Sequence, residues 1–116
     1  MHVTKTLALI SALSTGALSF KVRAYSGVGC TGSTQEINVW DNTCRDSNVL
    51  ATKSIRVLAY GAGRQRAFFW NRPECSAAKP DNVINDWWAD GGSNVFKKGR
   101  CIDLKGTSHA YSSISS

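Results

Sequence analysis

The stretch VRAYSGVGCTG, residues 22–32, ends a strand-like run in glycines and a cysteine, with Gly32 placed seven positions after Tyr25. Val, Arg, Ala and Tyr are compatible with an extended chain, whereas the glycines that follow favour a turn. The spacing is typical of a strand that runs into a structured hairpin. We therefore expect the fold to be organised around hairpins of this kind.

Short runs rich in β-branched and aromatic residues dominate the chain after residue 19, and none has a helical period. The expected strands are FKVRAY (20–25), QEINVW (35–40), SIRVLAY (54–60), RAFFW (66–70) and CIDL (101–104). Clusters of Gly, Asn, Asp and Pro separate these runs as turns and loops. The fold class is therefore all-β. The segment 80–92, PDNVINDWWADGG, is expected to be a long loop with a local turn at its start.

The N-terminal segment 1–19 has the pattern of a secretory signal peptide. Lys5 precedes an apolar run, and the small-x-small sequence Ala17-Leu18-Ser19 suits signal peptidase. The run is too short to span a bilayer, which takes about 20 residues, so we expect no transmembrane segment. A secreted, extracellular protein that begins near Phe20 is predicted, with one domain over residues 20–104 and a flexible Ser-rich tail over 105–116.

The cysteines also indicate export. Their number is even, and an oxidising compartment favours disulfides at about 3 kcal/mol each. No Cys-x-x-Cys pair is present, so no zinc site is expected. The four residues are Cys30, Cys44, Cys75 and Cys101.

The net charge of the expected mature chain is positive. Lys5 is the only charged residue of segment 1–19, so the remainder holds 13 of the 14 basic residues and all 8 acidic ones, a net charge of +5. Such a charge favours adsorption to anionic cell walls, phospholipid headgroups or acidic polymers, and the alternative is a charge that serves solubility alone.

An internal repeat is visible in the strand runs. The sequence VRAY (22–25) is echoed by VLAY (57–60), and EINVW (36–40) with a following cysteine is echoed by AFFW (67–70) with a following cysteine. We interpret these matches as two copies of one roughly four-stranded unit, over residues 20–56 and 57–104. Two such units facing each other would form a β-sandwich.

With Ser54 at the start of a later strand, the first unit resembles a βγ-crystallin Greek key motif. That motif carries an aromatic residue, a glycine seven positions later and a serine that opens the last strand, here Tyr25, Gly32 and Ser54. The resemblance implies a hairpin folded back over the sheet, in which the glycine adopts a positive φ. It also implies that the tyrosine ring covers the corner and that the serine hydroxyl ties it down.

The second unit departs from the motif. Tyr60 takes the aromatic position, but Ala67 stands where glycine is expected and Arg100 where the serine is expected. Many βγ-crystallins bind calcium next to the serine, yet here Val49-Leu50 and Lys53 replace oxygen ligands. We therefore expect no calcium, no other metal and no cofactor.

The pairing of the cysteines follows from the repeat only as an expectation. If each unit is self-contained, the disulfides are Cys30–Cys44 and Cys75–Cys101. The alternative that crosslinks the two units stays open, because four cysteines allow three pairings.

The resemblance also suggests a class of function. Small, secreted, disulfide-stapled members of this fold include microbial killer toxins and antimicrobial proteins, and one branch inhibits metalloproteinases. We expect a secreted, non-enzymatic, monomeric antimicrobial or effector protein that binds the wall, surface or membrane of another organism. The alternatives are a protease inhibitor that presents loop 61–65 or 71–75, and a cell-wall carbohydrate-binding protein. A nucleic-acid role is not expected.

No catalytic residue is predicted. His109, the one histidine after the signal segment, lies in the expected tail, and most carboxylates sit beside turn residues. Binding is instead assigned to basic and tryptophan residues of two regions. On a strand, Arg64 and Arg66 share a face with Phe68 and Trp70, and whether that face is core or open is not decided by the sequence. The candidates are Arg64, Arg66, Trp70, Arg72, Trp87, Trp88, Lys97, Lys98 and Arg100.

The adjacent tryptophans Trp87 and Trp88 form the second region. On an extended chain both cannot point inward, so one is exposed or the loop curls to bury both. An exposed indole could stack on a sugar or insert at a membrane interface. Lys97, Lys98 and Arg100 add positive charge nearby.

Overall fold

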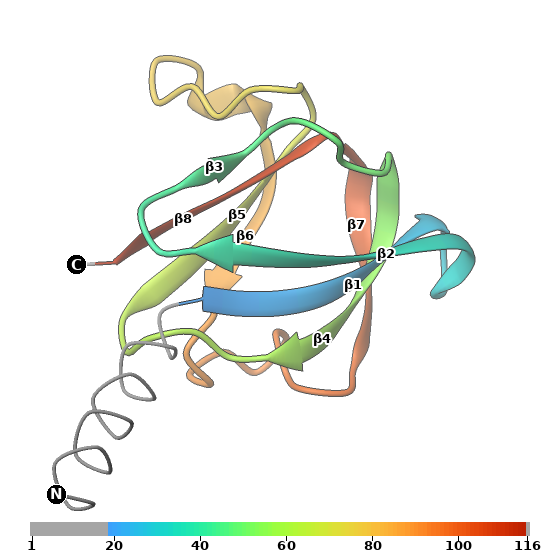
Figure 1. The fold of residues 1–116 in the computed structure, drawn as a ribbon, viewed down its shortest axis with the longest axis horizontal. Helices are drawn as coiled ribbons and strands as arrows, with labels where there is room; N and C mark the ends of the chain where they lie inside the picture. The colour runs from blue at the N-terminus through green and yellow to red at the C-terminus, as the bar shows by residue number, and fades with distance from the viewer. Residues whose placement is uncertain (1–18, 116) are drawn as a thin grey trace, which may run out of the picture.

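The computed structural model describes residues 19–115 of the chain. The expected signal peptide lies outside these residues except for Ser19, which begins the first strand. The described chain forms two antiparallel four-stranded sheets that pack face to face (Figure 1). The prediction of an all-β fold is confirmed.

The first sheet has the strand order β2-β1-β4-β7, and the second has the order β3-β8-β5-β6. The strands of the first sheet are β2 (Thr31–Trp40), β1 (Ser19–Gly27), β4 (Thr52–Ala59) and β7 (Cys101–Ser108). Those of the second sheet are β3 (Cys44–Arg45), β8 (Ala110–Ser115), β5 (Gln65–Trp70) and β6 (Val83–Trp88). A short 3-10 helix, η2 (Pro80–Asn82), precedes β6.

The two sheets are built from two equivalent halves, β1–β4 and β5–β8. If each strand is exchanged with its counterpart in the other half (β1 with β5, β2 with β6, β3 with β7 and β4 with β8), the order of the first sheet becomes β6-β5-β8-β3. This is the order of the second sheet in reverse direction. The third strand of each half lies in the other half's sheet, because β3 pairs with β8 and β7 pairs with β4. The expected boundary between residues 56 and 57 falls inside β4 and is wrong. The VRAY and VLAY echo matched β1 with β4 rather than with β5.

The core lies between the sheets and follows the two-residue alternation of the strands. Val22 of β1 and Ile37 of β2 are fully buried, while Lys21 and Arg23 point out from the same sheet. From the second sheet the ring of Phe69 enters the core. Its centroid lies 4.9 Å from that of Tyr111 and 5.6 Å from that of Trp87.

The expected flexible tail instead contributes to strands of both sheets. Residues 105–108 complete β7, and β8 lies between β3 and β5. Tyr111 is fully buried and donates a hydrogen bond from its hydroxyl to Thr52 Oγ1 at 2.8 Å. Ser113 Oγ accepts a hydrogen bond from Gln65 Nε2 at 2.6 Å. Serine is tolerated in this central strand because its hydroxyl finds a partner there.

The glycine and the serine of the first hairpin have the features that the resemblance implies. Gly32 has a φ of +87°, and a Cβ there would clash with Ser26 Oγ. Ser54 Oγ donates to Gly27 O at 2.6 Å and accepts from the Cys30 N–H at 2.8 Å. The serine of β4 therefore fastens the β1–β2 hairpin to the sheet.

In the second half, the counterpart of Tyr25 is Trp70 rather than Tyr60. Tyr25 pairs with Ser54 of β4, and Trp70 pairs with Ala110 of β8, the equivalent strand. Tyr25 and Trp70 are 8% and 7% exposed, respectively. Tyr60 follows the end of β4. It was assigned wrongly because the sequence echo matched β1 with β4, whereas the equivalent of β1 is β5.

The disulfides join Cys30 to Cys101 and Cys44 to Cys75, so both expected pairs are wrong. Each hairpin folds across the neighbouring strand of its own sheet and reaches the strand that the other half contributes. Cys101 is the first residue of β7 and Cys44 is the first residue of β3. The two bridges are equivalent under the symmetry of the halves, and each one crosslinks both halves.

Candidate functional site

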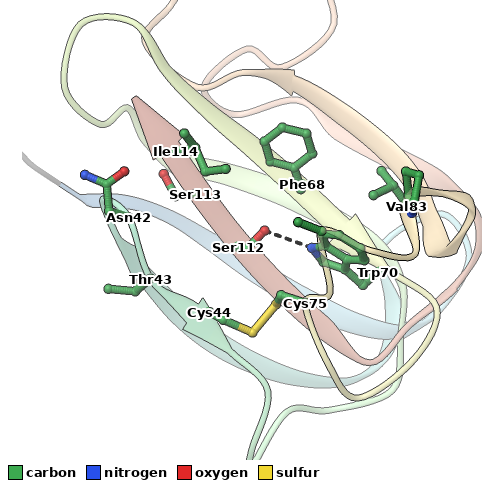
Figure 2. Close-up of a pocket in the computed structure, with 12 residues that line it drawn as sticks. Asn42, Thr43, Cys44, Phe68, Trp70, Cys75, Val83, Ser112, Ser113 and Ile114 are labelled. Atoms are coloured by element: carbon green, nitrogen blue, oxygen red, sulfur yellow. Dashed lines mark hydrogen bonds between the residues drawn. A yellow bond between two sulfur atoms is a disulfide. The ribbon is translucent and has the colours of Figure 1, made fainter. Parts of the chain in front are cut away.

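The outer face of the second sheet carries a groove of about 540 Å³, which we call the sheet-2 groove (Figure 2). Phe68 and Trp70 of β5 and Ile114 of β8 line it from the sheet. Val83, which opens β6, and the Cys44–Cys75 disulfide lie at its sides. The lining is mostly apolar, in contrast to the charged outer surface that solvent-facing sheets usually carry.

The alternation along β5 decides which side chains reach the groove. Phe69 points into the core, so Phe68 and Trp70 on either side of it point outward. The sequence had left open whether the Phe68 and Trp70 face is core or open, and it is the outer face.

Trp70 is nevertheless well covered. Its indole Nε1 donates a hydrogen bond to Ser112 Oγ at 2.8 Å, and only 7% of the residue is exposed (Figure 2). Segment 71–79 leads from it to the Cys44–Cys75 disulfide. Trp70 therefore acts as a fixed apolar surface of the groove rather than as a projecting anchor.

One end of the groove opens into a smaller hollow of about 140 Å³, which we call the arginine end. Arg64, Arg66, Trp88 and Ser115 line it, and it shares Phe68 and Ile114 with the groove. The two hollows are therefore neighbours on the same face of the sheet, with Phe68 and Ile114 bordering both.

Arg66 is held in place at the arginine end by two neighbours. Its Nη2 lies 2.6 Å from Asp86 Oδ2, and its Nε donates to the same oxygen at 2.7 Å. The guanidinium carbon lies 4.7 Å from the centre of the Trp88 ring, a cation–π geometry. Asp86 and Trp88 belong to β6 and fix the side chain of the adjacent strand.

Arg64 lies in the tight turn before β5 and has a φ of +66°. Its backbone N–H donates to Asp90 Oδ2 at 2.8 Å, and the Gly92 N–H donates to Asp90 Oδ1 at 2.9 Å. These backbone hydrogen bonds lower the pKa of the Asp90 carboxyl from its usual value, and the one from Arg64 has the larger effect. A further hollow of about 330 Å³, lined by Arg64, Trp88, Asp90 and Gly92, extends the surface beyond the arginine end.

The two adjacent tryptophans face opposite ways. Trp87 packs against the core, with its ring 6.1 Å from that of Phe96, whereas Trp88 is 39% exposed. They lie on strand β6, so the expectation of a long loop was wrong although the local turn at Pro80 is present. Asn85 and Asp86 disfavour a strand in the sequence. Both have distant partners, since Asn85 Oδ1 accepts from the Lys105 N–H at 2.9 Å and Asp86 binds a guanidinium.

The remaining basic candidates lie elsewhere. Lys97, Lys98 and Arg100 are exposed in the loop before β7, and the Lys98 ammonium lies 5.7 Å from the centre of the Tyr60 ring. Arg72 is exposed in the loop that follows β5. None of the four is among the described residues that line the groove or the arginine end.

Several residues that line the groove were not predicted from the sequence. Ile114, Ser112 and Val83 were missed because β8 was taken as a tail and β6 as a loop. The alternation in AYSSIS (110–115), where Ser112 and Ile114 share one face and Tyr111 the other, is the signal that could have revealed them.

Residues 19–115 contain neither a candidate metal centre nor a candidate membrane-spanning helix. No group of three or more His, Cys, Asp or Glu side chains in this range is arranged to hold a metal ion. Nor does any helix there have the length and apolar character needed to cross a bilayer. His109 lies between β7 and β8, and its backbone N–H donates to Trp70 O at 2.8 Å.

Comparison of the chain with models of known protein families, with curated proteins and with solved structures gives no match. The groove and the arginine end together offer an apolar surface with cations at one end, which suits binding.

Proposed function

We propose that the chain is a secreted, non-enzymatic protein of the βγ-crystallin-like killer-toxin type, an antimicrobial or effector protein. It acts by binding a component of the wall, surface or membrane of another cell. The sheet-2 groove is its binding surface. The arginine end contributes charge and an exposed indole at one end of that surface.

The single observation that carries the binding role is the apolar groove itself. A protein of this size has little apolar side-chain material to spare, yet Phe68, Trp70 and Ile114 face outward from a sheet whose other face already supplies the core. Concave apolar surfaces with a few fixed polar groups are typical of binding sites. Arginine and tryptophan are common at the centre of such sites.

The βγ-crystallin-like part of the proposal is supported by topology. The two strand orders are related by exchange of the halves, and each third strand crosses to the opposite sheet. A Greek key pair of this kind is what the Tyr25, Gly32 and Ser54 pattern suggested. The folded hairpin held by Ser54 Oγ supports the same assignment.

The test is growth inhibition and dye leakage by the oxidised protein beginning at Phe20. Yeast, filamentous fungi, bacteria and plant cells are challenged at low and moderate salt. We expect one group to be inhibited, and inhibition to be lost on reduction and in Ile114→Ser. Val28→Ser is the matched control, because Val28 and Ile114 are exposed to similar extents, 62% and 57%, and Val28 lies in the other half. Undisturbed growth of every cell type would contradict the proposal.

A carbohydrate-binding role is the second candidate, because Trp88 is exposed and has a guanidinium beside it. Retention on chitin or glucan, displaced by free sugar and lost in Trp88→Ala, would favour it. For protease inhibition, loop 61–65 is a tight turn with a left-handed residue at Arg64, unlike the extended segment that adds to a protease cleft. Loop 71–75, fixed by the Cys44–Cys75 disulfide, is the better inhibitor segment, and a protease panel tests it.

A further inference from the structure

We infer that the sheet-2 groove binds a long-chain fatty acid, with the acyl chain in the groove and the carboxylate at the arginine end. This inference deepens the proposed function by naming the class of ligand. It is carried by three features of the surface: its shape, the state of its polar groups, and the position of its cations.

The shape suits an elongated apolar group. The groove of about 540 Å³ and the arginine end of about 140 Å³ lie next to each other and share Phe68 and Ile114. Side by side they offer an elongated apolar surface on the outer face of the sheet, which we call the channel, within the size range of small-molecule sites. A chain of methylene groups can lie along such a surface, so that its apolar area is removed from water over the full length of the chain.

Of the polar side chains that line the groove, Thr43, Ser112 and Ser113 already have a hydrogen-bond partner, as does the indole of Trp70. Trp70 Nε1 donates to Ser112 Oγ at 2.8 Å, and Thr43 Oγ1 donates to Trp40 O at 2.5 Å. Ser113 Oγ accepts from Gln65 Nε2 at 2.6 Å. A sugar placed here would bring hydroxyls that need hydrogen bonds, and burying them without partners is unfavourable. An acyl chain has no such requirement, so the groove favours a lipid over a glycan.

The cations lie at one end of this channel. Arg64 and Arg66 both line the arginine end, and Arg66 is already oriented by Asp86 and Trp88. Arginine has five N–H donors, so a guanidinium that serves one carboxylate oxygen of Asp86 can also donate to a second carboxylate. Asp86 and Asp90 are the acidic groups near this end, and Asp86 competes directly with the ligand for Arg66.

The test is calorimetric titration of the oxidised protein with sodium oleate below its micelle concentration. Butyrate serves as the head group without the chain, and oleyl alcohol as the chain without the charge. We expect one oleate per chain, no binding of butyrate, and oleyl alcohol bound at least about tenfold more weakly. Equal affinity for oleate and oleyl alcohol, or tighter binding of a chitin or glucan oligosaccharide, would overturn the inference.

The variants test the two ends of the channel separately. Ile114→Ser should weaken oleate binding about fivefold, whereas Val28→Ser leaves it unchanged. Arg66→Gln should weaken it about fivefold, while Arg23→Gln, which removes a guanidinium paired with Glu36 on the other sheet, leaves it unchanged. Asp86→Asn should tighten it about two- to fivefold, because the guanidinium loses its competing carboxylate. Equal effects of either variant and its control would contradict the inference.

Growth inhibition by the same variants separates the two proposals. If oleate does not bind but cells are inhibited by the parent protein and not by Ile114→Ser, the lipid inference fails and the proposed function stands. If oleate binds as expected but no cell type is inhibited, the proposed function fails and the lipid site stands.

Discussion

The two sheets share one topology, yet their outer faces differ. On the first sheet, Lys21 and Arg23 of β1 reach Glu36 of β2 at 3.2 and 2.7 Å, so the face is charged and internally paired. On the second sheet, Phe68 and Ile114 take outward positions. Both inner faces already contribute to one core. The comparison therefore indicates that the apolar outer face is not required for folding and is available for binding.

The largest expected effects come from the two disulfides, which fix the hairpins. Replacing both cysteines of a bridge by serine should cost about 4 kcal/mol of unfolding free energy. The cost should be slightly larger for Cys30–Cys101, whose sequence separation is 71, than for Cys44–Cys75, whose separation is 31. Urea titration monitored by tryptophan fluorescence measures both. Only the Cys44–Cys75 variant should also lose ligand binding, and loss of binding in both would weaken the contrast between the faces.

The next effect separates the inner and outer faces of one strand. Phe69→Ala should destabilise the fold by about 3 to 4 kcal/mol, because Phe69 is fully buried between Tyr111 and Trp87. Phe68→Ala should cost about 1 kcal/mol, since Phe68 borders the groove. Urea midpoints with unchanged slopes give both values. A Phe68 cost that matches that of Phe69 would mean that the groove is structural.

A smaller effect compares two serine hydroxyls that bind backbone carbonyls, one in each half. Ser54→Ala should cost about 2 kcal/mol, because it leaves the Gly27 carbonyl and the Cys30 N–H without their partner. Ser108→Ala should cost about 1 kcal/mol, since Ser108 Oγ lies at longer distances, 3.2 and 3.0 Å, from Trp70 O and Ala110 O. Thermal or urea unfolding measures the difference, and an equal cost would show that Ser54 holds the β1–β2 hairpin no more strongly than Ser108 holds the end of β5.

The smallest effect is the pH dependence that Glu36 contributes on the first sheet. Hydrogen bonds from Arg23 and then Lys21 lower the pKa of the Glu36 carboxyl below its usual value of 4.5. Its stabilising contribution is thus full above the unfolded-state pKa and is lost as pH falls through the lower folded-state pKa. Urea midpoints below pH 5 should fall less for Glu36→Gln than for the parent. Ligand binding at neutral pH should not change, and a parallel fall of both midpoints would contradict this account.

The sequence predicts those parts of the fold that local composition determines. The five expected strands are present, because Val, Ile, Phe and Trp alternate there over turn-bounded runs. Strand β6 was not predicted because Asn85 and Asp86 disfavour a strand. Their partners lie on β7 and β5, which are too distant in sequence for a local pattern to include. Strand β8 was missed because its serines are typical of a flexible tail. In the fold, Ser113 and Ser112 accept hydrogen bonds from Gln65 and Trp70, which are distant in sequence.

The candidate site was predicted in part for the same reason. Arg66 and Trp70 were named from the face that they share on one strand, and Trp88 from its place beside Trp87, but the groove required the outer face of β8 and the disulfide at its side. The wrong cysteine pairing follows from one assumption, that each repeat closes on itself. Crossing of β3 and β7 to the opposite sheets is a property of the whole chain, and a local repeat does not reveal it.

If the chain is secreted as proposed, its nested disulfides also set an order of events during synthesis. Cys44 emerges soon after Cys30, whereas the native partner Cys101 is 71 residues away, about 4 to 14 s later at ordinary translation rates. A premature Cys30–Cys44 bond must then be exchanged through a mixed disulfide before β7 can dock. The yield of correctly folded protein should therefore depend on a disulfide isomerase in the producing cell.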